Sequence, residues 1–217
     1  MKEEHKIKLQ QVLPAEIEKR SFEIISKELS GVQLDVLQEP VIKRVIHTTA
    51  DFDYVENLCF SEGAVEKFHR AISGGACIVT DTQMAKSGIN KKELAKYGGE
   101  VYCFMSDEDV AEIAKKNQST RAVASMDKAA ALDKKLIFAI GNAPTALVRL
   151  YELMQDGILC PEGIIGVPVG FVNVVEAKEL ILQTSVPYIV AKGRKGGSNV
   201  AAAICNAFLY QLRDSRE

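Results

Sequence analysis

Hydrophobic residues recur at helical spacing through the first sixty residues of the chain and form short continuous runs from about residue 76 onward. Pro14 and Gly31 bound one predicted helix, because proline suits a first helical turn and glycine a helix end. Pro40 opens a second predicted helix, on which Arg44 and His47 lie three residues apart and should face the same side. We therefore expect a helical N-terminal segment.

The later hydrophobic runs are continuous rather than alternating in polarity, which is typical of parallel strands that are buried on both faces. Five strands are predicted, at residues 76–80, 100–104, 136–140, 163–167 and 187–191. Helices are predicted at residues 107–117, 120–132, 145–156, 174–183 and 198–212. This alternation indicates an α/β fold with a doubly wound, mostly parallel sheet of about five strands. Since no repeat or linker interrupts the pattern, we expect residues 1–217 to form a single domain.

Composition narrows the classes of partner. The chain is 47% hydrophobic and 26% charged, with a formal net charge of −2, which argues against broad nucleic-acid binding. No apolar run approaches the roughly 20 residues that cross a bilayer, and the N-terminus has no signal-peptide pattern. We therefore expect a cytoplasmic protein that uses neither nucleic acid nor membrane as a partner.

Cysteine spacing bears on metal binding. The five cysteines are widely spaced and lie mostly among apolar neighbours, at Cys59, Cys77, Cys103, Cys160 and Cys205. Neither a CxxC pair nor a Cys/His ligand spacing is present, so the pattern indicates free thiols and no metal site.

Ligands of open α/β sheets bind outside the carboxyl ends of the strands, and these ends are rich here in glycine and small polar residues. The candidate ligand-binding residues in these loops are Asp81, Met84, Asn142, Thr145, Gly170, Arg194, Gly196, Gly197 and Ser198. The segment 192–198 carries three cations and three glycines before a helix start. It is either a cradle for a carboxylate or phosphate or a solvated basic turn, and it matches neither the P-loop nor the dinucleotide pattern.

His47 is the best candidate for proton transfer, because histidine is the side chain that exchanges protons near neutral pH. It ends an apolar run, and Thr48, Thr49 and Asp51 follow it and are able to orient it. The partial negative charge of a helix C-terminus would favour the protonated imidazole. Of the other two histidines, one lies at position 5 in the charged N-terminus, and His69 is predicted on the polar face of a helix.

Two further polar residues have two readings each. Ser21 lies four residues from both Ile17 and Ile25, so its hydroxyl either bonds back to a carbonyl one turn earlier or contacts a ligand. Arg121 begins a helix of small residues and is either a salt-bridge donor or a ligand clamp. A GxSxG elbow, an HExxH motif and a carboxylate pair are all missing from the sequence. The chain therefore favours chemistry that needs one proton-transfer group and an anion-binding pocket.

Six motifs in order along nearly the whole chain together resemble the precorrin-8X methylmutase family, which includes a form that acts on cobalt-precorrin-8. The motifs are RSF at residues 20–22, VIHTTAD at 45–51, STRAVAS at 119–125, AIGNAPTAL at 139–147, GVPVGFVNVVEAKE at 166–179 and GRKGGSNVAAA at 193–203.

The resemblance implies an isomerase that moves a methyl group from C11 to C12 of the corrin ring by a sigmatropic shift, without an external cofactor. The products would be hydrogenobyrinate or cobyrinate, and the family works as a homodimer with its pockets near the subunit interface. His47 matches the catalytic proton donor, and Ser21, Arg44 and Arg121 match substrate contacts. The substrate carries many carboxylates, which suit arginine forks and loop N–H groups.

The sequence is also compatible with two other functions. One is a non-catalytic corrinoid carrier that uses the same pocket. The other is an unrelated α/β enzyme that binds a phosphorylated ligand through residues 192–198. The sequence leaves open whether the substrate contains cobalt.

Overall fold

The computed structural model describes residues 11–216, which fall into two compact units that divide after Gln33. The N-terminal histidine at position 5 lies outside the described residues. The first unit holds the turn η1 (Pro14–Glu16) and the helix α1 (Ile17–Glu28), and Pro14 occupies the first turn as predicted. That residues 1–217 act as one domain stays a prediction.

The second unit, from Leu34 onward, is built on a six-stranded sheet in the order β1-β6-β5-β4-β2-β3. Its strands are β1 (Leu58–Phe60), β2 (Cys77–Thr80), β3 (Val101–Tyr102), β4 (Leu136–Ile140), β5 (Gly163–Gly166) and β6 (Tyr188–Ala191). All pairs are parallel except β1 with β6. The predicted α/β fold with a mostly parallel sheet is therefore confirmed, and each of the five predicted strands is present.

The sixth strand, β1, lies where the sequence pattern predicts helix, and that prediction is wrong. Its three residues pair with β6 through Leu58–Ala191, Cys59–Val190 and Phe60–Ile189. A three-residue strand is too short to show a period of two, and its extended form depends on a partner that lies far away in the sequence.

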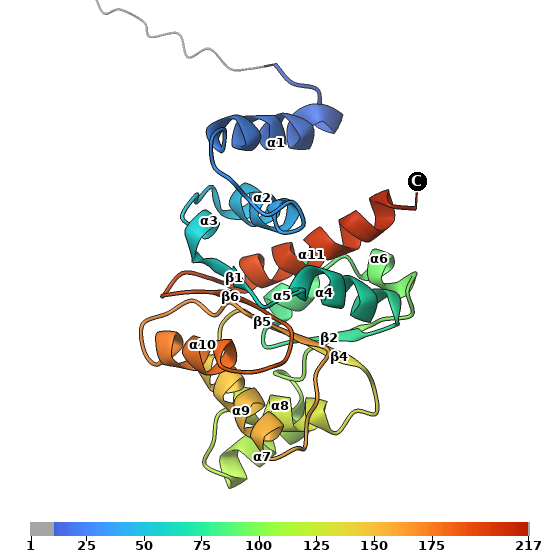
Figure 1. The fold of residues 1–217 in the computed structure, drawn as a ribbon. Coiled ribbons are helices and arrows are strands. Elements are labelled where there is room, and N and C mark those ends of the chain that lie inside the picture. The colour runs from blue at the N-terminus through green and yellow to red at the C-terminus, as the bar shows by residue number, and fades with distance from the viewer. Residues whose placement is uncertain (1–10, 217) are drawn as a thin grey trace, which may run out of the picture. The chain divides into compact units, whose positions relative to one another are not determined.

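Helices cover both faces of this sheet (Figure 1). On one face, successive helices pack side by side: α7 (Glu108–Lys116), α8 (Arg121–Ala130), α9 (Pro144–Gln155) and α10 (Val174–Leu182). On the other face, α11 (Ser198–Asp214) contacts α2 (Glu39–Thr49), α4 (Ala64–Ser73), α5 (Gln83–Gly88) and α6 (Lys91–Ala95). The short α3 (Tyr54–Asn57) precedes β1. The five helices that the sequence predicts after residue 100 are all present.

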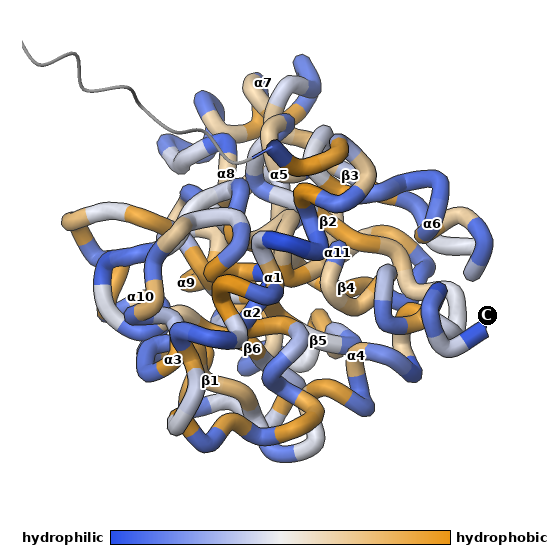
Figure 2. Tube along the Cα trace, turned by 90° about the horizontal axis from the view of Figure 1, so that it is seen from above, coloured by the Kyte–Doolittle hydropathy of each residue, from blue (hydrophilic) through white to orange (hydrophobic). Residues whose placement is uncertain are grey.

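One hydrophobic core of the second unit lies between the sheet and the layer of α8, α9 and α10. Phe138 and Ile140 of β4 are fully buried there, against Leu147 and Leu150 of α9. Figure 2 shows hydrophobic segments along β2 and β4. Burying both faces of these strands explains their continuous apolar sequence.

His69 departs from its prediction. It lies on α4 as expected, but it is half-buried rather than on a polar face, and its ring meets the Phe208 ring edge-on at 5.2 Å. Burial lowers the pKa of His69 below its ordinary value. Its position in the packing between α4 and α11 gives it a structural role.

The strand order determines where a ligand site is expected. After β2 the chain adds β3 on one side and then crosses to the other side of β2 for β4, β5 and β6. This reversal creates a switch point between β2 and β4, where ligands of doubly wound sheets bind. Among the described residues, no helix is long and apolar enough to span a bilayer.

Candidate functional site

His47 lies in the last turn of α2 and lines a pocket of about 280 Å³. Arg44 lines the same pocket one turn earlier, and its guanidinium lies 4.9 Å from the centre of the Tyr210 ring. The predicted common side of Arg44 and His47 is therefore confirmed. The opposite wall comes mainly from α11, through Asn199, Ala202, Ala203, Asn206 and Tyr210.

The polar residues after His47 bond to other partners. The hydroxyl of Thr48 donates to the Arg44 carbonyl at 3.0 Å, and that of Thr49 donates to the Val45 carbonyl at 2.8 Å. The Asp51 carboxylate instead forms an ion pair with Lys195. These contacts favour a role for the three residues in ending α2 rather than in orienting the imidazole.

Asp81 occupies the switch point. It follows β2, is buried, and its carboxylate accepts N–H bonds from Gly141 at 2.8 Å, Asn142 at 2.8 Å and Ala143 at 2.6 Å. Burial raises the pKa of Asp81 above its ordinary value, and the three N–H bonds act in the opposite direction. The loop after β4 thus has the anion-binding character expected from its sequence, but the chain's own carboxylate fills it.

The start of α11 reaches this point from the far end of the sequence. The hydroxyl oxygens of Ser198 and Thr82 lie 2.7 Å apart, and Thr82 also caps α5 by accepting the Ala85 N–H. A Cβ atom on Gly141 would lie 2.7 Å from the Ser198 Cα. Only glycine at position 141 lets the loop after β4 approach α11 this closely.

The loop after β5 contacts the basic segment 192–197. The Gly197 N–H donates to the Val167 carbonyl at 2.9 Å, and the Gly170 N–H donates to the Arg194 carbonyl at 3.2 Å. The Arg194 guanidinium lies 5.6 Å from the centre of the exposed Phe171 ring. The structure therefore brings most of the predicted strand-end residues into one continuous set of loops.

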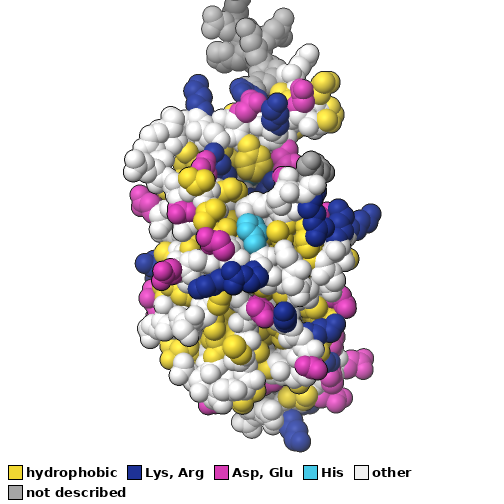
Figure 3. All heavy atoms as spheres, turned by 45° about the vertical axis from the view of Figure 1, so that its right-hand side comes forward, with side chains coloured by type: hydrophobic (Ala, Val, Ile, Leu, Met, Phe, Trp, Pro, Cys, Tyr) yellow, Lys and Arg dark blue, Asp and Glu magenta, His cyan; other side chains and the backbone are white. Residues whose placement is uncertain are grey.

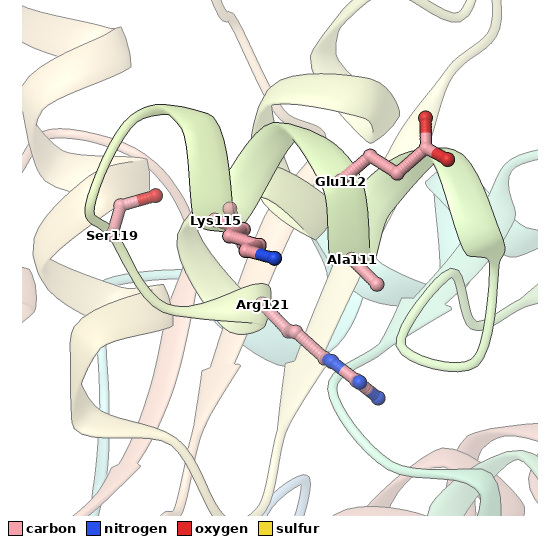
Figure 4. A pocket seen from close by; sticks show the side chains of 6 residues that line it. Ala111, Glu112, Lys115, Ser119 and Arg121 are labelled. Atoms are coloured by element: carbon pink, nitrogen blue, oxygen red, sulfur yellow. The ribbon is translucent and has the colours of Figure 1, made fainter.

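Arg121 lies at the start of α8 and lines a different pocket, of about 440 Å³, with residues of α7 (Figure 4). The preceding Thr120 caps α8, and its hydroxyl oxygen lies 3.1 Å from that of Thr145 at the start of α9. Arg121 is thus connected to the loop after β4, although it does not line the pocket that holds His47.

Two predicted contacts lie elsewhere. The Ser21 hydroxyl donates to the Ile17 carbonyl at 2.9 Å, as in the first reading of that residue, and Ser21 belongs to the first compact unit. Met84 lies on α5 with 70% of its surface exposed.

Lys178 is a residue of the site region that sequence reasoning missed. It lies on α10 with only 1% of its surface exposed, and its Nζ donates to the carbonyls of Gly193 and Lys195, both at 2.8 Å. Burial lowers the pKa of Lys178 to about 8. The signal for its burial was present, because Lys178 lies four residues after Val174 and three before Ile181, both of which are buried.

Lys195 ties the basic segment to the chain that follows His47. Its Nζ lies 2.6 Å from a carboxylate oxygen of Asp51 and 2.6 Å from one of Asp53. These contacts raise the pKa of Lys195 and lower that of Asp51. Of the three cations in the segment, Lys195 therefore has an internal function.

The face drawn in Figure 3 shows no dominant sign of charge, because Lys and Arg side chains are interspersed with Asp and Glu.

All five cysteines are free. Among residues 11–216, no group of three or more His, Cys, Asp or Glu side chains is arranged to hold a metal ion.

Replacing Gly196 with alanine is expected to destabilise the basic segment. A Cβ atom on Gly196 would clash with the Val167 carbonyl, a backbone atom that cannot rotate away. We expect a loss of about 1–3 kcal/mol in the free energy of unfolding, measured by urea denaturation. Gly193→Ala is the matched variant, because Gly193 has a φ of +75° with no atom within 4 Å of its Cβ position. A cost for Gly196→Ala no larger than that for Gly193→Ala would contradict the clash.

Comparison with known proteins gives one consistent result. The family model described as CbiC, precorrin-8X methylmutase, matches residues 16–211. The cobalt-precorrin-8 methylmutase of Salmonella typhimurium is 48% identical over 208 residues, which cover 93% of this chain and 97% of the relative. The precorrin-8X methylmutase of Pseudomonas aeruginosa is 36% identical, over 88% of this chain and 92% of its own. The crystal structure of precorrin-8x methyl mutase from Thermus thermophilus superposes with a TM-score of 0.83 at 39% identity, covering 92% and 98% of the two chains.

Proposed function

The chain belongs to the precorrin-8X methylmutase family, isomerases of cobalamin biosynthesis, and we propose that it moves a methyl group from C11 to C12 of a precorrin-8-type corrinoid. The observation that carries this proposal is the shared pocket of His47 and Arg44 beside the start of α11. A proton-transfer group and a guanidinium in one pocket suit a reaction that needs a single acid and a substrate rich in carboxylates.

His47 supplies the proton in this proposal. Protonation of a ring nitrogen beside the migrating methyl withdraws electron density from the conjugated ring, which eases the shift of the methyl to the adjacent carbon. The electron pair of the broken C11–methyl bond enters the π-system of the ring, a π pair of the ring forms the new C12–methyl bond, and the ring nitrogen then returns its proton to His47. Atoms and electrons balance in this way, and no external cofactor is consumed. The enzyme also lowers the barrier by holding the flexible macrocycle in a reactive shape.

The peripheral carboxylates are assigned to the surrounding cations and loops. Arg44 lies in the pocket itself, Arg194 extends the strand-end loops, and Arg121 lines the neighbouring pocket. Ser21 is proposed as a further contact on the family pattern. Asp81 is reassigned from ligand contact to loop support, because its carboxylate is already bonded to three N–H groups.

We propose the cobalt-containing form as the natural substrate. The chain is more similar to the cobalt-precorrin-8 methylmutase of Salmonella than to the precorrin-8X methylmutase of Pseudomonas, at similar coverage. The metal is part of the substrate in this proposal.

We further propose a cytoplasmic homodimer. The pocket of about 280 Å³ lies just below the roughly 300–1,000 Å³ range of drug-sized ligand sites, and the pocket of about 440 Å³ lies in its lower part, whereas a tetrapyrrole is a large ligand. A second copy would complete the enclosure. Five free thiols suit a reducing compartment.

An anaerobic absorbance assay tests the function. Wild-type protein is mixed separately with cobalt-precorrin-8 and with metal-free precorrin-8X, and the change of chromophore is followed. We expect conversion of both, with at least a tenfold higher kcat/KM for the cobalt form. Equal or reversed preference would contradict the choice of cobalt, and tight binding of both without conversion would contradict the mutase proposal and favour a carrier.

A further inference from the structure

Burying the Lys178 side chain costs desolvation free energy. Its two hydrogen bonds hold a loop, and a functional need for that loop would explain why a lysine is buried at this position. An amine with 1% of its surface exposed is expensive to bury while charged. Among the described residues, no carboxylate forms an ion pair with Lys178, and both of its bonds go to main-chain carbonyls of the basic segment. An apolar side chain at this position of α10 would avoid the desolvation cost. The two hydrogen bonds to the basic segment therefore indicate what the lysine does.

The two carbonyls determine how the loop presents its N–H groups. In a trans peptide the C=O and the following N–H point in opposite directions. The Gly193 carbonyl belongs to the same peptide as the Arg194 N–H, and the Lys195 carbonyl to the same peptide as the Gly196 N–H. Because both carbonyls point at the Lys178 amine, the N–H groups of Arg194 and Gly196 point away from it.

These two N–H groups have no hydrogen-bond acceptor within the described part of the chain, whereas neighbouring backbone groups do. Lys192 donates to the Asn57 carbonyl at 2.7 Å, and Gly197 donates to the Val167 carbonyl at 2.9 Å. The loop therefore offers a pair of N–H donors that are two residues apart in the sequence. A pair of backbone N–H donors without an internal acceptor favours an anion.

We propose that Lys178 is a positioning residue that fixes the basic segment 192–197 so that the N–H groups of Arg194 and Gly196 bind a peripheral carboxylate of the substrate. The inference rests on the proposed function for the identity of the anion, because a corrinoid precursor presents acetate and propionate groups. Lys178 itself touches no substrate and acts through the two carbonyls.

The same loop is connected to the catalytic histidine. Lys195 binds Asp51 and Asp53, which follow His47 by only a few residues. Lys178 thus supports a loop with two contacts. Its N–H groups bind the periphery of the substrate, and its Lys195 side chain binds the segment after α2. Substrate placement, rather than proton transfer, is the step that depends on Lys178.

The contacts do not require Lys178 to carry a charge. A neutral amine retains two N–H donors, which matches the two carbonyls that it contacts. Deprotonation above about pH 8 therefore leaves the loop in place. The appropriate test removes the donors rather than the charge.

Lys178→Met keeps the length and packing of the side chain and deletes the donors. We expect KM for cobalt-precorrin-8 and Kd for the product cobyrinate to rise at least tenfold, with kcat changed by less than threefold. Lys178→Arg, which restores donors, should recover part of the affinity. The control is Lys91→Met, on the exposed surface of α6, for which all three constants should stay within twofold of wild type.

Trypsin provides a readout that needs no activity. Lys192, Arg194 and Lys195 are cleavage sites within the loop, and Lys178→Met should be cut there at least five times faster than wild type. Unchanged KM, Kd and cleavage rate in a folded Lys178→Met protein would overturn the proposal. A change in thermal stability alone, with unchanged affinity and cleavage, would also overturn it, because that is the result of a purely structural role.

A wild-type measurement covers the case in which Lys178→Met does not fold. Backbone amide resonances of Arg194 and Gly196 should shift when cobyrinate is added, and unshifted resonances with bound cobyrinate would refute the anion site. Failure of wild type to convert any precorrin would overturn the mutase proposal instead, while the cleavage experiment would still judge the role of Lys178.

Discussion

His47→Gln is expected to lower kcat by about 10²–10⁴-fold while leaving the Kd of the corrinoid product within about threefold of wild type. Glutamine keeps a polar side chain of similar reach in the pocket between α2 and α11 but does not transfer a proton at neutral pH. Stopped-flow absorbance under anaerobic conditions gives the rate of methyl migration, and absorbance titration with cobyrinate gives the affinity. The split between rate and affinity assigns the imidazole to chemistry rather than to binding.

His69→Gln is the matched control, because it removes the other histidine of the described structure. His69 packs against Phe208, so its replacement should lower thermal stability and leave kcat at 25 °C within threefold of wild type. If His47→Gln and His69→Gln lowered kcat equally, the loss would reflect damage to the α11 surface that both contact, and His47 would not be the acid.

Asp81→Ala is expected to give the largest loss of stability of any single polar replacement in the strand-end loops, about 3–5 kcal/mol in the free energy of unfolding. The variant leaves the N–H groups of Gly141, Asn142 and Ala143 without the carboxylate that accepts them. Asp81→Asn should cost less, about 1–3 kcal/mol, since one oxygen remains. Urea denaturation of both variants measures these losses.

Two comparisons make the Asp81 test specific. Asp214→Asn removes an exposed carboxylate that pairs with Arg213 and should change stability by less than about 0.5 kcal/mol.

Because the folded-state pKa of Asp81 is raised, the wild-type free energy of unfolding should fall relative to that of Asp81→Asn as pH rises from the ordinary value of 3.8 through the folded-state pKa. A cost for Asp81→Ala below 1 kcal/mol would show that the loop after β4 does not need this anchor.

The parallel sheet was predictable because burial on both faces leaves a direct trace in the sequence. β4 reads Leu-Ile-Phe-Ala-Ile, and every one of its residues is buried. The segment around β1 leaves no such trace, because Leu58 to Phe60 form an edge strand of three residues with a mixed burial pattern. Its conformation is decided by pairing with β6, which the local sequence does not contain.

The sequence predicted which residue types line the candidate site. It did not predict which of them bind one another within the folded chain. Helical spacing alone placed Arg44 and His47 on one side of α2, and both line one pocket. Asp81 was predicted to contact a ligand, and Lys195 lies in a segment predicted either as an anion cradle or as a solvated turn, yet each binds another part of the chain. Such pairings join residues that are 60 and 144 positions apart, so no local pattern distinguishes them from ligand contacts.

The carboxylate of Asp81 also bears on what the protein rejects. Doubly wound sheets commonly use the switch point to capture phosphate groups of nucleotides, and in this chain the N–H groups of the loop after β4 bond to Asp81 instead. Here a tethered carboxylate competes with any free anion at a high effective concentration, and it never diffuses away. We therefore expect phosphorylated metabolites to bind weakly at this position, because the Asp81 carboxylate already occupies it. The same fold can then bind a tetrapyrrole without competition from abundant nucleotides.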